Sequence, residues 1–145
     1  MADFLTPVDR SAQMRRIRKV DTKPELVVRR LVHAMGFRYR LHCSSLPGTP
    51  DIVLPRHRKV IAVHGCFWHQ HEGCKLARRP KSRLDYWLPK LARNVERDHA
   101  ARIALAEAGW ASFTVWECQT RNVDALEKIL RQFLARQPSA RDEGT

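Results

Sequence analysis

Long apolar runs and an apolar leader are both absent from this 145-residue sequence. No segment approaches the roughly 20 apolar residues that a membrane-spanning helix needs. The opening residues, MADF, do not begin a basic stretch followed by an apolar one, as a secretory signal would. We therefore expect a cytoplasmic protein with no membrane partner. In that compartment the four cysteines are better interpreted as metal ligands or free thiols than as disulfides.

Acidic residues are scarce relative to basic ones. The sequence has 15 Asp and Glu against 27 Lys and Arg, which gives a formal net charge of +12 and a pI near 10.4. A surface of this charge attracts polyanions, of which nucleic acid is the commonest. A ribosome-associated or membrane-surface protein is the alternative. The hydrophobic content of 43% is ordinary, and the length suits one domain with a real core.

Apolar periodicity and turn residues divide the sequence into seven predicted elements. Asp21 or Thr22 can cap a helix that is entered through Pro24 and ended by Gly36. The later elements are predicted as strands at 37–41, 51–54 and 59–63, a long helix from about 85 to 109, a strand at 110–116 and a helix at 123–134. The long helix should hold Pro89 in its first turn or at a kink. This order predicts an α/β domain with a mixed central sheet, helices on its faces and loops gathered at one end.

Two flanking segments differ from the rest in composition. Residues 1–20 are basic with few apolar positions, and residues 138–145 are polar. We expect an arm, a central domain over 21–137 and a flexible tail. The arm, which includes Met14, is either a solvated terminus or an element that lies on nucleic-acid phosphates.

The long helix carries one carboxylate on its predicted buried side. Leu91, Val95 and Leu105 mark that side by their spacing, and Asp98 falls on it. A buried carboxylate needs a partner. The partner is either Arg102, one turn later, or a histidine that the carboxylate holds as a general base.

The stretch HGCFWHQHEGC at residues 64–74 concentrates histidine, cysteine and aromatic side chains directly after a strand pattern. Cys66, His71 and Cys74, together with the later Cys118, make a closed tetrahedral zinc set. Such a set leaves no open position, so the zinc would be structural. The alternative is that Cys118 is a small buried residue at a strand end. Cys43 is expected in the core.

Asp51, His64 and His69 are the remaining polar candidates. Asp51 opens a strand after LPGTP, where it either caps a turn or supplies a hard oxygen ligand for Mg²⁺. One of the two histidines could take a proton from water.

Phe67, Trp68 and Trp87 are large rings close to these polar groups. Core packing is the usual fate of such rings. In a polar loop of a basic protein, they could instead act as wedges that enter a base stack.

Five motifs between residues 9 and 134 carry a family resemblance. They are RSAQMRRIRKVDTKPE, LPGTPDIV, VHGCFWHQHEGC, YWLPKLARNVERD and GWASFTVWEC. Together they resemble the very-short-patch mismatch repair endonucleases of bacteria, the Vsr family. The resemblance implies a restriction-endonuclease-like fold. It also implies a strand-specific nick on the 5′ side of the mismatched thymine in T·G pairs, which arise when 5-methylcytosine deaminates.

The resemblance also implies roles for residues at matching motif positions. The residues that the resemblance implies to be catalytic are Asp51, His69, Asp98, His64 and Glu25. Within this group, Asp51 would bind Mg²⁺ with the backbone carbonyl of Val63, and Asp98 would orient His69 as the base. The implied zinc ligands are Cys66, His71, Cys74 and Cys118. The implied DNA-contacting residues are the wedge of Phe67, Trp68 and Trp87 and, in the minor groove, Met14.

Three departures from the family pattern concern the same region. Valine at position 63 stands where threonine is familiar, but a carbonyl ligand does not depend on the side chain. Gln70 and Gly73 lengthen the loop that carries the zinc ligands. The wider nuclease-fold motif would place an acidic residue and a lysine near Ala62 and His64, and their absence fits a histidine base.

The sequence therefore predicts a Mg²⁺-dependent DNA nicking endonuclease with a structural Zn²⁺. Its expected partner is double-stranded DNA with a T·G mismatch in the bacterial nucleoid, and mismatch-repair proteins are further candidates. A monomer suffices for a nick in one strand. The alternatives are a DNA-binding module without activity and a zinc hydrolase of small substrates. The charge excess and the closed zinc set argue against the hydrolase.

Overall fold

The computed structural model describes residues 21–78 and 80–136. Four strands form one mixed sheet in the order β1-β2-β3-β4, namely Arg40–Leu41, Ile52–Leu54, Lys59–His64 and Ala111–Trp116. The first three strands pair antiparallel, and β3 pairs parallel with β4. The helices are α2 (Lys23–Ala34), α3 (Leu84–Glu107) and α4 (Val123–Ala135), with short 3-10 turns η1 (Pro55–His57), η2 (Lys75–Ala77) and η3 (Glu117–Arg121). The predicted α/β class and mixed sheet are confirmed.

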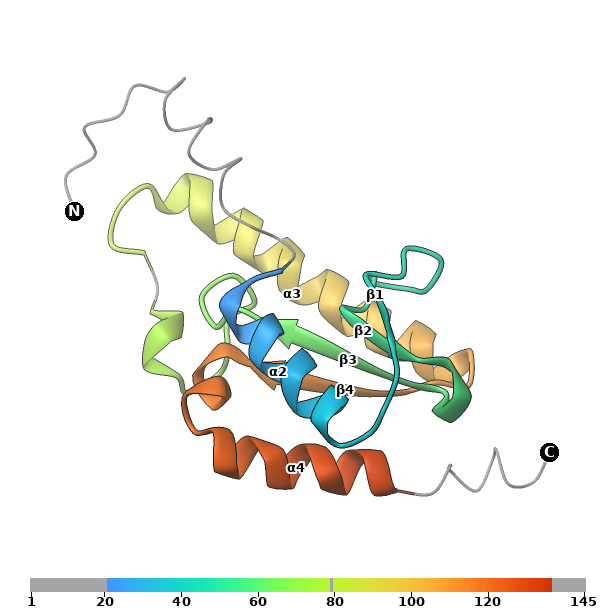
Figure 1. Cartoon of the computed structure of the whole chain (residues 1–145). Coiled ribbons are helices and arrows are strands. Elements are labelled where there is room, and N and C mark those ends of the chain that lie inside the picture. The colour runs from blue at the N-terminus through green and yellow to red at the C-terminus, as the bar shows by residue number, and fades with distance from the viewer. Residues whose placement is uncertain (1–20, 79, 137–145) are drawn as a thin grey trace.

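Helices cover both faces of the sheet (Figure 1). On one face, Val28 and Val32 of α2 and Leu126 and Leu130 of α4 pack with Ile61 and other strand residues in the main core. On the other face, α3 contributes Leu105, which joins a smaller cluster around Val53 and Val60. Cys43 is half-buried against this second cluster, in keeping with its predicted place in the core. No helix in the described part of the chain has the length and apolar character needed to cross a membrane.

Helix boundaries follow local chemistry. Thr22 caps α2, because its Oγ1 accepts a hydrogen bond from the Glu25 backbone N–H at 3.3 Å. Gly36, with φ of +95°, follows the end of the same helix as predicted. At the end of α4, the buried Lys59 ammonium donates to the carbonyls of Phe133, Leu134 and Arg136 at 2.8–3.0 Å. Lys59 thereby satisfies the last carbonyls of α4 and joins that helix to the start of β3.

Two sequence-based expectations need correction, and a third is narrowed. The strand predicted at 37–41 contains only its last two residues, because only these find partners on β2. Val95 was predicted to be buried on α3 but is 43% exposed, because the inner side of the helix runs through Asn94 and Asp98 and Val95 lies one position away from it. Of the two places predicted for Pro89, the first turn is excluded, because Pro89 lies at the sixth position of α3. The predicted arm with Met14 and the predicted tail at 138–145 lie outside the described residues.

Candidate active site and metal centre

The candidate residues gather where β2 begins and where β3 and β4 end. Because β2 and β3 are antiparallel, the residue before β2 lies beside the last residues of β3. Because β3 and β4 are parallel, the segments after His64 and after Trp116 leave the sheet at the same edge. Sheet topology therefore brings together three separate segments of the sequence, namely the start of β2, the end of β3 with the loop that follows it, and the residues after β4.

Asp51 is held against the end of β3. Its Oδ2 accepts a hydrogen bond from the Val63 backbone N–H at 2.7 Å. Burial raises the pKa of Asp51 to about 6, and the charge of Glu25 adds to that rise, whereas the Val63 N–H and the histidines His42 and His69 oppose it. A buried carboxylate with a second carboxylate nearby favours a bound cation, which would offset both the desolvation and the repulsion.

His69 and Asp98 form a close pair across the gap between the loop and α3. His69 Nδ1 lies 2.5 Å from Asp98 Oδ2. The pairing makes Nδ1 the protonated nitrogen and leaves Nε2 as the basic one. Of the two partners considered for Asp98, the histidine is therefore the one that the structure provides. This geometry is that of an imidazole oriented to accept a proton from water.

His64 lies directly under His69. The two rings stack with centroids 3.8 Å apart and planes 8° from parallel, and His64 Nε2 is 3.9 Å from Asp98 Oδ1. Burial lowers the pKa of His64 to about 4, and the neighbouring His69 lowers it further, while Asp98 opposes the shift. His64 is therefore neutral at pH 7. Its ring packs against the His69 ring and does not carry a charge that would repel a protonated His69.

The three cysteines and His71 converge as the sequence predicts. Their ligand atoms all lie within 4.8 Å of one another. His71 Nδ1 is 3.6 Å from Cys66 Sγ and 3.5 Å from Cys118 Sγ. Separations of this size are what a tetrahedral ion sets between ligands at about 2.0–2.3 Å from the metal. Two thiols and an imidazole at this spacing, with Cys74 completing the set, fit zinc in donor type and number.

Backbone contacts hold this group in place. The His71 N–H donates to the Cys66 carbonyl at 2.9 Å, and the Cys66 N–H donates to Glu117 Oε1 at 3.3 Å. The His71 ring stacks on Trp116 with centroids 4.2 Å apart. Burial raises the pKa of Cys66 to about 12, so a cation is needed to stabilise its thiolate.

The aromatic residues form one cluster beside the histidines. Phe67, Trp68 and Trp87 are half-buried, and their ring centroids are 5.3–5.6 Å apart. The Asn94 side chain donates to the Trp68 carbonyl at 3.1 Å, which fixes the loop against α3. The rings are thus neither core residues nor loose surface groups. They pack on one another and keep part of their area accessible.

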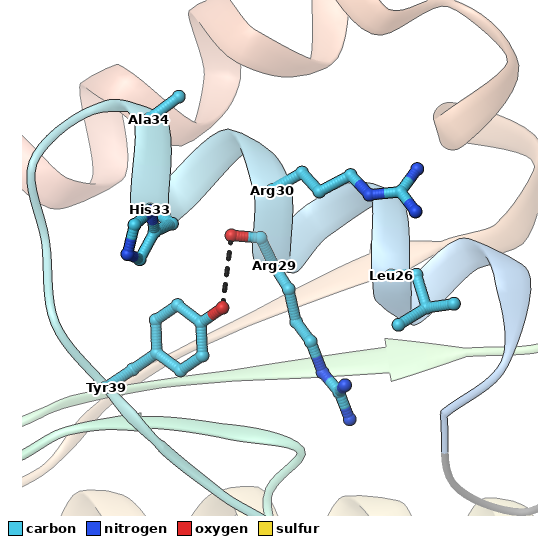
Figure 2. A pocket seen from close by; sticks show the side chains of 6 residues that line it. All are labelled: Leu26, Arg29, Arg30, His33, Ala34 and Tyr39. Carbon is cyan, nitrogen blue, oxygen red and sulfur yellow. Dashed lines mark hydrogen bonds between the residues drawn. The ribbon is translucent and has the colours of Figure 1, made fainter.

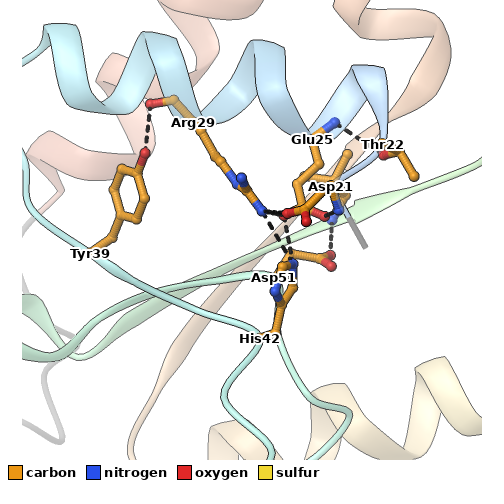
Figure 3. A network of polar contacts seen from close by, with 8 residues as sticks. Asp21, Thr22, Glu25, Arg29, Tyr39, His42 and Asp51 are labelled. Atoms are coloured by element: carbon orange, nitrogen blue, oxygen red, sulfur yellow. Dashed lines mark hydrogen bonds and ion pairs between the residues drawn. The ribbon is translucent and has the colours of Figure 1, made fainter. Parts of the chain in front are cut away.

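Glu25 has partners that sequence reasoning missed. Its carboxylate is bonded to the Arg29 guanidinium, to His42 Nε2 at 2.6 Å and to the Asp21 backbone N–H at 3.1 Å (Figure 3). The spacing of Glu25 and Arg29, one helical turn apart, is a signal that could have found that pair. No motif marks His42, which approaches Glu25 only through the fold.

A shallow hollow of about 330 Å³ lies along the outer side of α2 (Figure 2). It is lined by Leu26, Arg29, Arg30, His33, Ala34 and Tyr39. The Tyr39 hydroxyl donates to the Arg29 carbonyl at 3.3 Å across it. None of the predicted site residues in the described part of the chain lines this hollow.

Comparison with known proteins places this arrangement in a family. The family model for DNA mismatch endonuclease Vsr matches residues 2–75. A type II nicking enzyme, V.XorIIP of Xanthomonas oryzae pv. oryzae, is 50% identical over 134 residues, covering 92% of this chain and 98% of the relative. The chain belongs to the Vsr family. The DNA mismatch endonuclease Vsr of Escherichia coli is 42% identical over 126 residues, which cover 87% of this chain and 80% of that protein.

A second type II nicking enzyme has a sequence identity to this chain similar to that of the Escherichia coli protein. The type II nicking enzyme V.NmeAIP of Neisseria meningitidis is 41% identical over 136 residues, covering 91% of this chain and 96% of its own. These alignments extend well beyond the part matched by the family model. They therefore also cover the segment after the cysteine and histidine loop, which contains Asp98 and Cys118.

Proposed function

We propose that this chain is a DNA endonuclease that nicks one strand on the 5′ side of the mismatched thymine in T·G pairs. Membership of the Vsr family and similarity to nicking enzymes support the endonuclease activity. The T·G preference rests on the family description and on the similarity to the Escherichia coli mismatch endonuclease. Within the structure, the observation that carries the proposal is the His69–Asp98 pair beside the buried Asp51.

His69 is proposed to start the reaction. Its Nε2 would remove a proton from water as the water oxygen attacks the scissile phosphorus. Asp98 stabilises the imidazolium that forms, through the bond to Nδ1. The bond from phosphorus to the 3′ oxygen breaks, and that oxygen takes a proton from solvent. The nick then carries a 5′ phosphate and a 3′ hydroxyl.

Asp51, with the backbone carbonyl of Val63, is proposed to hold Mg²⁺. The donors are oxygens, as this cation prefers, and the raised pKa of Asp51 shows a carboxylate that lacks sufficient compensation. When bound, Mg²⁺ would polarise the scissile phosphate and stabilise the leaving oxygen. Glu25 and His64 are proposed as supporting residues. Zn²⁺ held by Cys66, His71, Cys74 and Cys118 would be structural, since it would have no open position.

The rest of the chain is proposed to bring DNA to this edge. We propose a restriction-endonuclease-like domain at 21–137 preceded by a DNA-contacting arm that includes Met14. The aromatic cluster would enter the base stack beside the mismatch, because its rings are preassembled and partly accessible. A duplex with a T·G pair is the substrate, and a monomer would suffice. Mismatch-repair proteins are further proposed partners.

A nicking assay tests the proposal against its main alternative, a DNA-binding module without activity. The substrates are duplexes that differ only in a single T·G or T·A pair, with Mg²⁺ present. We expect wild type to nick the thymine strand of the T·G duplex, and His69→Ala and Asp51→Ala to lose at least about a hundredfold in rate. His33→Ala, an exposed histidine on α2, is the matched control and should retain activity. Wild type that binds both duplexes and nicks neither would establish the binding module instead.

A further inference from the structure

Glu25 is an ionisable side chain that the proposed chemistry leaves without a defined task. It is 1% exposed, so its charge is almost fully removed from water. An isolated carboxylate in such a place would protonate or turn toward solvent. Instead, both its oxygens accept hydrogen bonds from donors on α2, before α2 and after β1. The orientation of Glu25 is therefore determined by three separate segments.

His42 connects Glu25 with Asp51. Its backbone N–H donates to the Asp51 carbonyl at 3.0 Å, which extends the pairing of β1 with β2 by one residue. Its φ of +46° is in the left-handed region, which is uncommon for a residue with a side chain. The same residue places Nε2 2.6 Å from Glu25 Oε2 (Figure 3). His42 thus contacts the backbone of Asp51 and the side chain of Glu25.

Arg29 supplies the balancing charge. Its Nη2 bonds to both Asp21 and Glu25 and lies 3.5 Å from His42 Nε2. The ligand atoms of Asp21, Glu25 and His42 lie close enough together to hold a cation. The guanidinium already occupies the space between them, with only 14% of its side chain exposed. Arg29 therefore offsets one of the two carboxylate charges of this second cluster and takes the place that an ion would occupy.

We propose that Arg29 and His42 are positioning residues that hold Glu25 beside Asp51 in one orientation, and thereby set the affinity of the Asp51 site for a divalent cation. The inference deepens the proposed function and rests on its assignment of Asp51. Support comes from the geometry, because the His42 backbone is bonded to the Asp51 carbonyl while the His42 ring is bonded to the Glu25 carboxylate. If Glu25 moved, the charge around Asp51 would change although no atom of Asp51 had been altered.

A titration of the full chain with Mn²⁺ in the absence of DNA tests this proposal directly. Electron paramagnetic resonance measures the bound and free Mn²⁺. We expect His42→Leu and Arg29→Met to weaken Mn²⁺ binding by about 10- to 100-fold, as loss of residues that orient metal ligands typically does. His42→Gln should restore most of the affinity, because its amide N–H can still donate to Glu25. Tyr39→Phe is the matched control, since it removes a hydroxyl bond to Arg29 but leaves the carboxylate contacts intact.

Nicking and DNA binding separate the possible outcomes. The variants should need more Mg²⁺ for half-maximal nicking and should bind DNA without Mg²⁺ as tightly as wild type. The inference is overturned if folded His42→Leu binds Mn²⁺ like wild type, or if His42→Gln and His42→Leu lose affinity equally. A different outcome is that the Mn²⁺ affinities of wild type and the variants follow the expected order while wild type never nicks DNA. That result would contradict the proposed function and support the positioning role.

Discussion

At the scale of the residue, Asp51 combines partial burial with a neighbouring carboxylate, which is unfavourable for stability. Its carboxylate is desolvated, and Glu25 lies near enough to raise its pKa further. The hydrogen bond from the Val63 N–H and the charges of His42 and His69 offset these effects only in part. Such a group lowers the stability of the protein while no cation is bound, because the charged form is disfavoured in the folded state.

Asp51→Asn should therefore stabilise the protein when Mg²⁺ is absent. The folded pKa of Asp51 is about 6, above the ordinary 3.8, so the folded state holds this proton more tightly. Stability consequently falls as pH rises from about 4 to about 6, and the full cost is present at pH 7. Asn has no charge to desolvate and can still accept from the Val63 N–H. We expect a gain of roughly 1–3 kcal/mol at pH 7.

Urea unfolding at several pH values measures this effect. The gain should shrink toward zero below about pH 4, where the Asp51 carboxyl is protonated in both states. The nicking activity should be lost at every pH, since the amide is a poor cation ligand. If Asp51→Asn is only as stable as wild type at pH 7, or less stable, the charged Asp51 carboxylate does not destabilise the folded protein as proposed.

Residue chemistry also explains what the sequence could and could not predict. A carboxylate on the inner side of α3 requires a partner, but its chemistry left Arg102 and two histidines open, and only the family resemblance named His69. The cysteine and histidine group followed from ligand type and compartment. His42 was not predictable, because its role depends on a left-handed backbone and on the register of β1 with β2. Val95 was predicted wrongly because a step of four residues from Leu91 fits a helix face as well as the step of three that leads to Asn94, which is the residue on the inner side.

At the scale of the element, the segment before β2 positions Asp51 by packing closely on α3. Gly48 has φ of +74°, and a Cβ built on it would lie 2.6 Å from the Ala101 Cβ of α3. Only glycine meets both conditions, because the left-handed conformation and the close approach each exclude a side chain. This contact fixes the loop at 44–50, and through it the start of β2, against the helix that carries Asp98.

Gly48→Ala should destabilise the protein by about 2–4 kcal/mol, which combines a backbone cost with a steric one. Gly36→Ala is the matched control. It has φ of +95° but nothing within 4 Å of the added Cβ, so it should cost only about 1 kcal/mol. Ala101→Gly in the Gly48→Ala background should recover part of the steric loss in a double-mutant cycle. Equal costs for the two glycines in urea unfolding would show that the contact with α3 is unimportant.

The loop between β3 and α3 depends on a different kind of support. In its described residues, 65–78 and 80–83, the short turn η2 is the only helical element and few apolar side chains are buried. Besides the bonds from α3 to Trp68 and His69, the cysteine and histidine group is therefore a main support of the loop. Cys66→Ser should lose stoichiometric zinc and make residues 65–83 sensitive to proteolysis, because the metal supplies local folding energy. Zinc content by mass spectrometry and limited proteolysis measure both effects.

Cys43→Ser is the control for the cysteine variant. Cys43 packs against the second core cluster and lies outside the ligand group, so the variant should keep its zinc. The main core under α2 and α4 should survive in both variants, since its side chains do not touch the loop. Full zinc retention by Cys66→Ser would refute the assigned ligand set.

At the scale of the whole molecule, affinity and discrimination have different sources. The net charge of +12 supplies attraction to any phosphate backbone. The aromatic cluster at the sheet edge is the part that could distinguish one base pair from another. Trp68→Ala should therefore reduce the preference for T·G over T·A duplexes more than it reduces overall binding.

Competition binding at two salt concentrations checks this separation. Raising the salt should weaken wild type and Trp68→Ala by similar factors, because the phosphate contacts are unchanged. The ratio of T·G to T·A affinity should fall by about tenfold in the variant, on the scale of one lost base–aromatic stack. Equal losses on both duplexes would contradict a wedge role for Trp68.

The parallel pairing of β3 with β4 has a consequence for the protein during its synthesis. His71 and Cys118 are 47 positions apart, and all of α3 is translated between them. A nascent chain therefore exposes three metal ligands well before the fourth leaves the ribosome. The loop that carries His69 and the aromatic rings can reach its final form only after β4 has joined the sheet. A prematurely terminated chain that stops before Cys118 would therefore lack the fourth of the proposed zinc ligands.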